Sequence, residues 1–198
     1  SHGSMTGQML EKIEEVLLAE SPDMVMVYGD TNSTLAGALA ASKLNIPIAH
    51  VEAGLRSFNN KMPEEINRIL TDRVSSLLFC PTPNAVDNLT DEGVENWGGE
   101  VVLSGDVMQD GANYYREFSA PPPGLKSDSD FILCTMHRAE NTDSLGRLRG
   151  IVEALKALAK SHQVVMPLHP RTKKALSEHS LELTGVTLIE PVGYLNMI

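Results

Sequence analysis

The sequence predicts an α/β fold made of two Rossmann-like domains, each with a parallel sheet. Short apolar runs alternate with helical patterns along the whole chain, which is typical of parallel strands joined by helices. Polar clusters directly follow several of these runs, where an open parallel sheet forms its ligand crevice. A stretch with three prolines interrupts the alternation, which then restarts. We therefore predict domains at residues 6–119 and 131–198, with a linker at 120–130.

The first domain is predicted to hold four short strands. Apolar residues at helical spacing predict a helix over residues 6–19, whereas Ser1 to Ser4 resemble the remnant of an expression tag. Thr31 or Asn32 can cap a second helix, and Pro63 suits the first position of a third, on which Ile66, Leu70 and Val74 share one face. The predicted strands cover residues 24–28, 46–51, 77–80 and 101–103, and the other helices cover 35–42, 84–92 and 110–118.

The second domain repeats the alternation with fewer elements. We predict strands at 131–135, 164–167 and 186–189, and helices at 145–161 and 171–178. Residues 191–198 have the pattern of the start of another helix. Three strands make a thin core, so we expect this sequence to be part of a longer protein.

Composition limits the class of protein. A formal charge of −10 argues against a nucleic-acid partner, and no apolar run is long enough to predict a membrane span. Cys80 and Cys134 lie in apolar runs without CxxC spacing, which predicts free buried thiols in a cytoplasmic protein; Cys134 as a nucleophile is the alternative. Neither metal-ligand spacing nor a GxGxxG or GxxxxGK[ST] motif is present, so we expect no metal and no bound cofactor.

Carboxylates follow the first two predicted strands. Asp30 precedes a helix, so it either caps that helix or extends into the crevice. Glu52 follows a buried strand, and burial there would shift its pKa toward neutral pH. Glu64 and Glu65 lie in the first turn of a helix, where the helix dipole alone explains them; if one of them faces the crevice, Glu52 and Glu64 form an acid–base pair.

Basic residues accompany these carboxylates and also follow the strands of the second domain. Arg56 and Arg68 either pair with the acids or bind a ligand phosphate. His137 and Arg138 come shortly before a helix, which suits a phosphate site, and the cluster that begins at His169 repeats this arrangement one strand later. A structural role is the alternative for each histidine.

The polar clusters, in this order and spacing, resemble the non-hydrolysing UDP-N-acetylglucosamine 2-epimerases. The resemblance rests on Gly29-Asp30-Thr31, His50-Val51-Glu52-Ala53-Gly54-Leu55-Arg56, Pro63-Glu64-Glu65-Ile66-Asn67-Arg68 and Thr135-Met136-His137-Arg138-Ala139-Glu140-Asn141. It implies two Rossmann-like domains of the GT-B type and interconversion of UDP-N-acetylglucosamine and UDP-N-acetylmannosamine. The implied route is removal of the C2 proton, elimination of UDP, and re-addition of UDP with the proton returned to the other face.

The resemblance also implies roles and partners. Asp30, Glu52, Glu64 and His137 match the catalytic positions, without settling which carboxylate removes the C2 proton. The residues expected to bind the UDP-sugar are Arg56, Arg68, Arg138 and His169. The family's Gly-Thr-Arg-Pro-Glu loop and Ser-Gly-Gly-x-Gln-Glu-Glu segment are absent from this sequence. We therefore expect an inactive or weakly active chain that forms a homodimer through uncovered sheet edges and apolar faces.

Three alternatives stay open. The run Gly105-Asp106-Val107-Met108 has Asp106 where the family commonly has Asn, which hints at a UDP-2,3-diacetamido-glucuronate 2-epimerase. A GT-B glycosyltransferase would share the fold but has no need of the three carboxylates. A non-catalytic module that binds nucleotide sugars is the third alternative.

Overall fold

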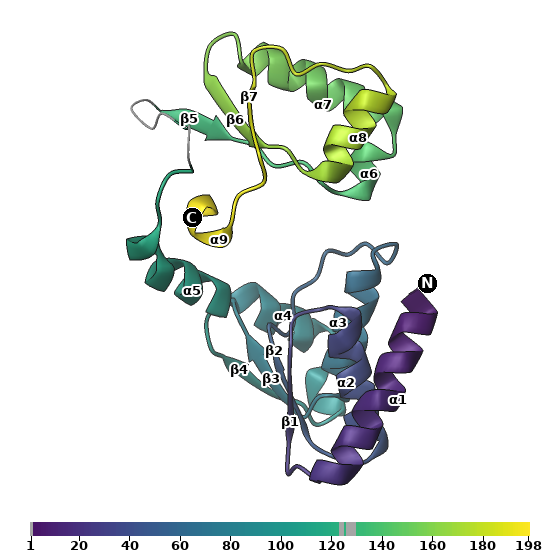
Figure 1. The fold of residues 1–198 in the computed structure, drawn as a ribbon. Helices are drawn as coiled ribbons and strands as arrows, with labels where there is room; N and C mark the ends of the chain where they lie inside the picture. The colour runs from purple at the N-terminus through teal and green to yellow at the C-terminus, as the bar shows by residue number, and fades with distance from the viewer. Residues whose placement is uncertain (1, 123–124, 126–129) are drawn as a thin grey trace. The chain divides into compact units, whose positions relative to one another are not determined.

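The computed structural model describes residues 2–122, 125 and 130–198 (Figure 1). The chain divides into two compact units, Ser1–Gly111 and Ala112–Ile198, which are described separately. Each unit contains a parallel sheet with helices, so the predicted fold class is confirmed. Most of the predicted linker lies outside the described residues, and the predicted domain limits stay a prediction.

The first unit is built on a four-stranded parallel sheet with the strand order β1-β2-β3-β4. The strands are β1 (Val25–Tyr28), β2 (Ile48–Val51), β3 (Leu77–Cys80) and β4 (Glu100–Leu103). Register pairs Val27 with His50 and His50 with Leu78, so these three side chains share one face. His50 therefore lies in the middle of the sheet, on the face that packs against helices.

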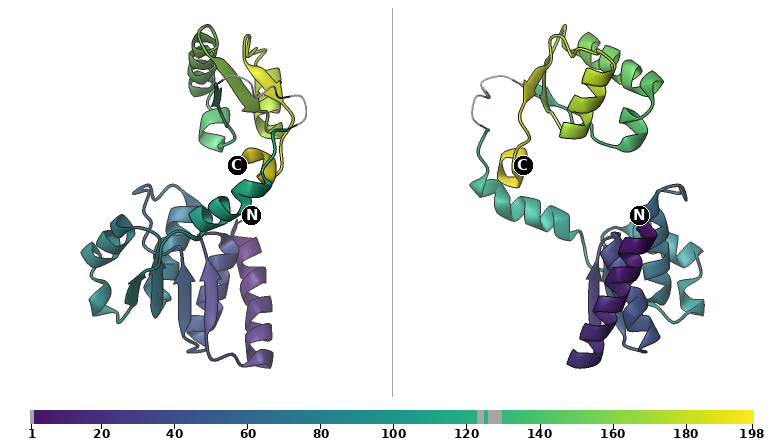
Figure 2. Two further views of the ribbon diagram at one scale, coloured as in Figure 1. Left: turned by 90° about the vertical axis from the view of Figure 1, so that its left-hand side faces the viewer. Right: turned by 45° about the vertical axis from the view of Figure 1, so that its right-hand side comes forward.

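Helices cover that face. Figures 1 and 2 show α2, α3 and α4 beside the sheet, with α1 packed along α2. The helices are α1 (His2–Glu20), α2 (Asn32–Lys43), α3 (Pro63–Val74) and α4 (Pro83–Asp91), with a short 3₁₀ turn at Val94–Asn96. Helix α5 (Val107–Tyr115) crosses the boundary between the two units, and a 3₁₀ turn at Arg116–Phe118 follows it in the second unit. Helix α1 begins before the predicted start and includes residues 2–4, which resemble part of a tag.

The start of α2 confirms Thr31 as its cap. The Thr34 amide donates to Thr31 Oγ1 at 3.3 Å, and the Thr31 amide donates to Thr34 Oγ1 at 3.2 Å. These reciprocal bonds form a capping box. The Thr34 hydroxyl also donates to the Tyr28 carbonyl at 2.6 Å, which joins the helix start to the end of β1. The loop that carries Asp30 is thus fixed at both ends.

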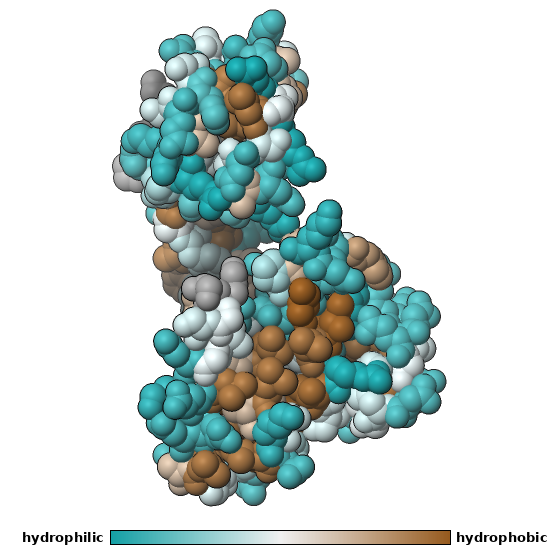
Figure 3. All heavy atoms as spheres, turned by 90° about the vertical axis from the view of Figure 1, so that its right-hand side faces the viewer, coloured by the Kyte–Doolittle hydropathy of each residue, from teal (hydrophilic) through white to brown (hydrophobic). Residues whose placement is uncertain are grey.

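Helix α3 packs through a polar face. Ile66 and Leu70, on the predicted apolar face, are 46% and 44% exposed. The residues that α3 buries are Glu65, Asn67, Thr71 and Asp72. Figure 3 shows apolar residues gathered on one face of this unit. Hydrogen bonds and ion pairs, rather than an apolar stripe, therefore position α3.

The second unit has a three-stranded parallel sheet with the order β5-β6-β7. Leu148, Val152, Met166 and Leu176 form part of its core, between β6 and the two longer helices. The strands are β5 (Phe131–Leu133), β6 (Gln163–Pro167) and β7 (Thr187–Ile189); the helices are α6 (Ala139–Thr142), α7 (Leu145–Leu158), α8 (Pro170–Glu178) and α9 (Tyr194–Met197). The sequence did not predict α6, which is only one turn long.

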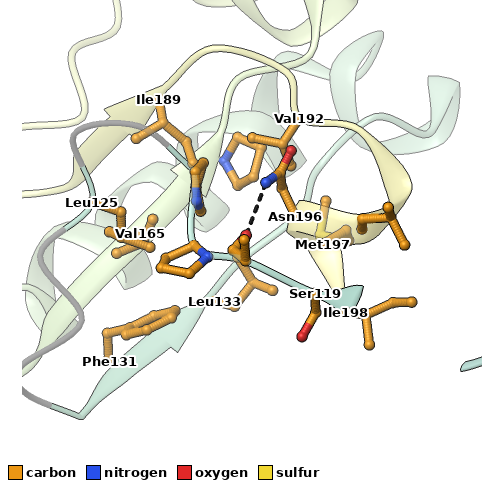
Figure 4. Close-up of a pocket in the computed structure, with 15 residues that line it drawn as sticks. Ser119, Leu125, Phe131, Leu133, Val165, Ile189, Val192, Asn196, Met197 and Ile198 are labelled. Atoms are coloured by element: carbon orange, nitrogen blue, oxygen red, sulfur yellow. Dashed lines mark hydrogen bonds between the residues drawn. The ribbon is translucent and has the colours of Figure 1, made fainter. Parts of the chain in front are cut away.

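The other face of this sheet lines an apolar pocket of about 380 Å³ (Figure 4). One wall consists of strand side chains, including Phe131, Val165 and Ile189, and another comes from α9. Asn196 Nδ2 donates to the carbonyl of Ala120, the first residue of the predicted linker, at 2.8 Å, and this bond holds α9 there.

Candidate functional site

Asp30 and Glu52 meet at the carboxyl edge of the first sheet. The Gly29 amide donates to the Val51 carbonyl at 3.0 Å, so β1 and β2 stay paired up to the residues that precede the two acids. A Cβ added at Gly29 would lie 3.7 Å from Glu52 Oε2. The Glu52 carboxylate therefore reaches across the end of β1, next to Asp30.

Glu52 has a backbone conformation that residues other than glycine rarely adopt. Its φ is +77°, in the left-handed region. The amides of Glu52 and Ala53 both donate to the Phe79 carbonyl, at 3.2 and 3.0 Å. Gly54 also has a φ of +77°, and a Cβ there would lie 2.3 Å from the Ala85 carbonyl oxygen. A positive φ at a residue other than glycine, as at Glu52, typically costs about 1–3 kcal/mol, and such residues are found mostly at functional sites.

The surroundings of Glu52 raise its pKa above the usual value for glutamate. Burial is the largest cause, and the negative charges of Asp30 and Asp106 add to it. Arg68 and His50 act in the opposite direction without cancelling the effect. The expected direction of the shift is confirmed, and a carboxyl group with a raised pKa suits proton transfer near neutral pH.

Helix α3 holds the loop after β1. The Arg68 guanidinium forms an ion pair with the Asp30 carboxylate. Asn67 Nδ2 donates to the Asp30 carbonyl at 2.9 Å. The same Arg68 donates to Glu65 Oε2 at 3.1 Å. Of the two alternatives for Arg68, pairing with acids or binding a ligand phosphate, the structure shows the pairing, and one of the paired acids is Asp30.

The two adjacent glutamates of α3 have different environments. Glu65 is 1% exposed and accepts the Ser57 and Phe58 amides at 3.0 and 2.7 Å. Burial alone would raise the pKa of Glu65, but these bonds and Arg68 outweigh it and lower the pKa. Glu64 is exposed at the start of the helix. Glu65 therefore holds the loop before α3 in place, whereas Glu64 is exposed and has no such structural role.

Asp106 is an acid that the sequence-based list of site residues missed. It follows β4, and its charge is among those that raise the pKa of Glu52. Its position after a strand end is the same signal that singled out Asp30 and Glu52. The carboxylates that act on Glu52 are Asp30 and Asp106. The pairing of Glu52 with Glu64 stays a prediction.

Arg56 is engaged in a buried ion network. Its side chain is 2% exposed, and it donates to Asp72 Oδ2 at 2.7 Å and to the Glu92 carboxylate at 2.7 and 2.8 Å. Burial alone would lower the pKa of Arg56, but the two carboxylates outweigh this effect and raise the pKa above its usual value. These contacts support the pairing alternative for Arg56, and its contact with a ligand stays a prediction.

In the second unit, two histidines come together at the carboxyl edge of the sheet. His137 follows β5 and His169 follows β6, and their ring centroids lie 5.8 Å apart. His169 caps α8 by accepting the Arg171 amide at Nδ1, at 3.1 Å. Arg138 precedes α6 with an exposed side chain, whereas Arg171 pairs with Asp143 at 2.8 Å. This arrangement offers imidazole and guanidinium donors to an anion.

The cysteines are free, and Cys80 is buried as predicted. Burial is the main cause that raises the pKa of the Cys80 thiol to about 11, and burial also raises the pKa of the partly buried Cys134. A raised pKa leaves little thiolate at neutral pH, which argues against Cys134 as a nucleophile. Within the described part of the chain, no group of three or more His, Cys, Asp or Glu could hold a metal ion. Nor is any helix there long and apolar enough to cross a bilayer.

Comparison with known proteins gives the family. The sequence model of the family described as UDP-N-acetylglucosamine 2-epimerase matches residues 1–198. The chain belongs to the UDP-N-acetylglucosamine 2-epimerase family. It is 59% identical over 199 residues to a Pseudomonas aeruginosa protein named UDP-2,3-diacetamido-2,3-dideoxy-D-glucuronate 2-epimerase. It is 45% identical over 212 residues to UDP-N-acetylglucosamine 2-epimerase of Methanocaldococcus jannaschii.

Solved structures agree with this assignment. A crystal structure of the M. jannaschii epimerase in complex with UDP-GlcNAc and UDP matches with a TM-score of 0.84 at 45% identity, over 100% of this chain and 57% of that chain. The Neisseria meningitidis epimerase bound to UDP-GlcNAc matches with a TM-score of 0.79 at 32% identity, over the same shares. The two curated relatives are covered to 56% and 57% of their length. This family member therefore spans a little over half of its relatives.

Proposed function

We propose that the whole protein is a UDP-sugar 2-epimerase. By the whole protein we mean a polypeptide that contains these residues together with the part that the relatives have in addition. The observation that carries the proposal is Glu52, which has a strained backbone and a raised pKa and lies beside Asp30 at the sheet edge. Membership of the epimerase family supports the reaction class.

The first unit supplies the acid–base chemistry in this proposal. One carboxylate takes the C2 proton while the C1–oxygen bond breaks, and UDP leaves with the bonding electron pair. The C–H electron pair becomes the C1–C2 double bond of a glycal intermediate. Re-addition of UDP at C1 then accompanies return of a proton to the opposite face of C2. Asp30, Glu52 and Glu64 are the proposed proton carriers, and Arg68 holds Asp30 in place.

The second unit supplies the anion site in this proposal. His137, Arg138 and His169 are the proposed contacts of the UDP diphosphate. Two of them directly precede helices, whose N-terminal dipole favours negative charge. Exposed Arg138 has the planar donor geometry that suits phosphate oxygens.

Two sugars are candidates for the substrate. UDP-N-acetylglucosamine is favoured by the family and by relatives of that name. UDP-2,3-diacetamido-glucuronate is favoured by the 59% identical relative, whose name contains that sugar. Asp106 beside the site is the residue that first pointed to the second sugar.

Incubation of the whole protein with each UDP-sugar in deuterated water tests the proposal. We expect deuterium at C2 and formation of the C2 epimer, and the sugar that exchanges faster is the substrate. Transfer of the sugar to an acceptor would instead indicate a glycosyltransferase. Binding of both sugars without C2 exchange would indicate a non-catalytic module. A cytoplasmic location and a homodimer remain part of the proposal.

A further inference from the structure

We propose that Asp72 is a positioning residue that acts on Glu52 and Asp30 through a buried, doubly protonated His50. The inference rests on the proposed epimerase function. Asp72 lies in the third turn of α3, is 1% exposed, and belongs to none of the clusters that suggested the site. Its contacts nevertheless reach residues on both sides of Glu52: the side chain of His50 and the backbone amide of Gly54.

The Asp72 carboxylate spans the turn that contains Glu52. Its Oδ2 accepts the Gly54 amide at 3.1 Å, two residues after Glu52. Its Oδ1 lies 2.6 Å from Nδ1 of His50, two residues before Glu52. One side chain therefore fixes both ends of a turn whose central residue has a strained φ of +77°. A rigid support of this kind is what keeps a reacting group within the narrow range of productive positions.

His50 extends the connection to Asp30. The ring is 0% exposed, and its Nε2 lies 2.8 Å from the carbonyl oxygen of Gly29, the residue before Asp30. Gly29 has a φ of +65°, so its peptide orientation depends on contacts of this kind. Asp72, His50 and Gly29 thus form a continuous chain of contacts from α3 to the loop of the second acid.

The contacts of His50 determine how many protons it carries. A neutral imidazole has one N–H donor, yet Nδ1 faces a carboxylate oxygen and Nε2 faces a carbonyl oxygen. The other Asp72 oxygen already accepts from Arg56 at 2.7 Å, as expected for an ionised carboxylate. Both ring contacts are hydrogen bonds only when both nitrogens carry protons. His50 is then an imidazolium whose buried charge is balanced by Asp72.

The charge of His50 affects the proposed proton carrier. Burial, Asp30 and Asp106 raise the pKa of Glu52, whereas Arg68 and His50 lower it. Loss of the His50 charge would therefore raise the pKa of Glu52 further. A base must be ionised to accept a proton, so the pH at which Glu52 becomes active would also rise.

Nitrogen-15 NMR of the wild-type whole protein tests the proton count without any variant. We expect two protected ring N–H signals from His50, assigned by their loss in His50→Gln. A single ring N–H signal would overturn the proposal. This result does not depend on activity, so it is informative even when no UDP-sugar is turned over.

Kinetics of Asp72→Asn in the whole protein tests the effect on the reaction. The asparagine keeps the size of the side chain and an oxygen for Gly54 and Arg56, but its NH₂ group faces Nδ1 of His50, which then loses a proton. We expect kcat to fall by about tenfold or more, since misplacement by about 1 Å can cost about 100-fold, with KM within about twofold. The acidic limb of the pH–rate profile should move to higher pH, and His50→Gln should do the same.

Matched controls separate the possible failures. Asp87→Asn changes an exposed carboxylate of α4 and should leave kcat, KM and the pH profile unchanged. Wild-type kcat and pH profile in Asp72→Asn would refute the positioning role, and so would losses in kcat and UDP affinity of equal size, which mark a purely structural residue. If Asp72→Asn does not fold, the wild-type NMR signals decide. Absence of C2 exchange in the wild type would instead refute the proposed function.

Discussion

Arg68 of α3 forms an ion pair with Asp30, the acid that follows β1. The same guanidinium contacts the buried Glu65, so one arginine joins a candidate proton carrier to a structural carboxylate. Asp30 is therefore oriented from a helix that follows it by more than thirty positions in the sequence. The acids at this sheet edge depend on α3 for their placement.

Glu52→Gln and Glu64→Gln in the whole protein should each lower turnover by about 10²–10⁴, because each removes a proton carrier and keeps the side-chain shape. UDP affinity should change little. C2 exchange in deuterated water and a UDP titration measure the two effects. Glu95→Gln, at an exposed glutamate of a 3₁₀ turn, is the control. Near-normal turnover in both variants would contradict the assignment.

Glu52→Gln should also stabilise the chain at neutral pH. The pKa of Glu52 is raised in the folded state above the reference value of 4.5, so the folded state prefers the protonated carboxyl. Its contribution to stability is complete below the unfolded pKa and is lost as the pH rises through the folded pKa. We expect a higher Tm for the variant at pH 7 and equal Tm values well below pH 4.5. A lower Tm of the variant at pH 7 would contradict this sign.

Glu65→Gln should destabilise the first unit by about 1–3 kcal/mol, because an amide NH₂ would face backbone donors in a buried site. The pKa of Glu65 is lowered, so the stability it contributes is present above the unfolded pKa and is lost as the pH falls through the folded pKa. Urea unfolding at several pH values measures this. The exposed neighbour provides the control, since Glu64→Gln should change stability by less than about 0.5 kcal/mol.

The sequence was sufficient for most of the regular elements, α6 being an exception, and insufficient for the buried polar contacts. Strand β3 matches its predicted residues 77–80, and Thr31 caps α2, because local patterns determine both. No local pattern separates Glu64 from Glu65. Their roles differ because the Ser57 and Phe58 amides approach only one of them, and that approach is a tertiary contact.

The same reason explains why Asp72 could not be predicted. Asp72 lies in mid-helix without a motif of its own, and its partners are spread from His50 to Arg56. Asp106 follows a strand end, so the sequence did contain a signal for it. The apolar residues at helical spacing on α3 indicated a core-facing side. The helix instead buries its polar side, where His50 and Arg56 contact Asp72.

His137→Ala in the whole protein should weaken UDP binding, because it removes a donor at the proposed phosphate site. Calorimetric titration with UDP measures the change, which we expect to be about tenfold, equivalent to about 1.4 kcal/mol. His179→Ala, at an exposed histidine after α8, is the control. Unchanged UDP affinity in the His137 variant would make His137 a structural residue.

The 198-residue chain by itself should lack epimerase activity and should self-associate. Its edge strand β1 exposes Met26 and Tyr28, at 49% and 60%, and an open apolar edge favours pairing with a second copy. Light scattering over a range of concentrations should show a dimer, and Met26→Lys should weaken it. Gln8→Lys adds the same charge at an exposed position of α1 as a control. A monomer at every concentration, or full activity, would contradict this prediction.

The network of His50, Arg56, Asp72 and Glu92 has an evolutionary consequence. Loss of any one member leaves a buried charge or donor without its partner, which typically costs several kcal/mol, whereas replacement of the whole set by apolar residues can be neutral. Single substitutions within the set would therefore be eliminated by selection. The four positions are expected to vary as a block, so that a divergent homologue either retains all four residues or has exchanged them together.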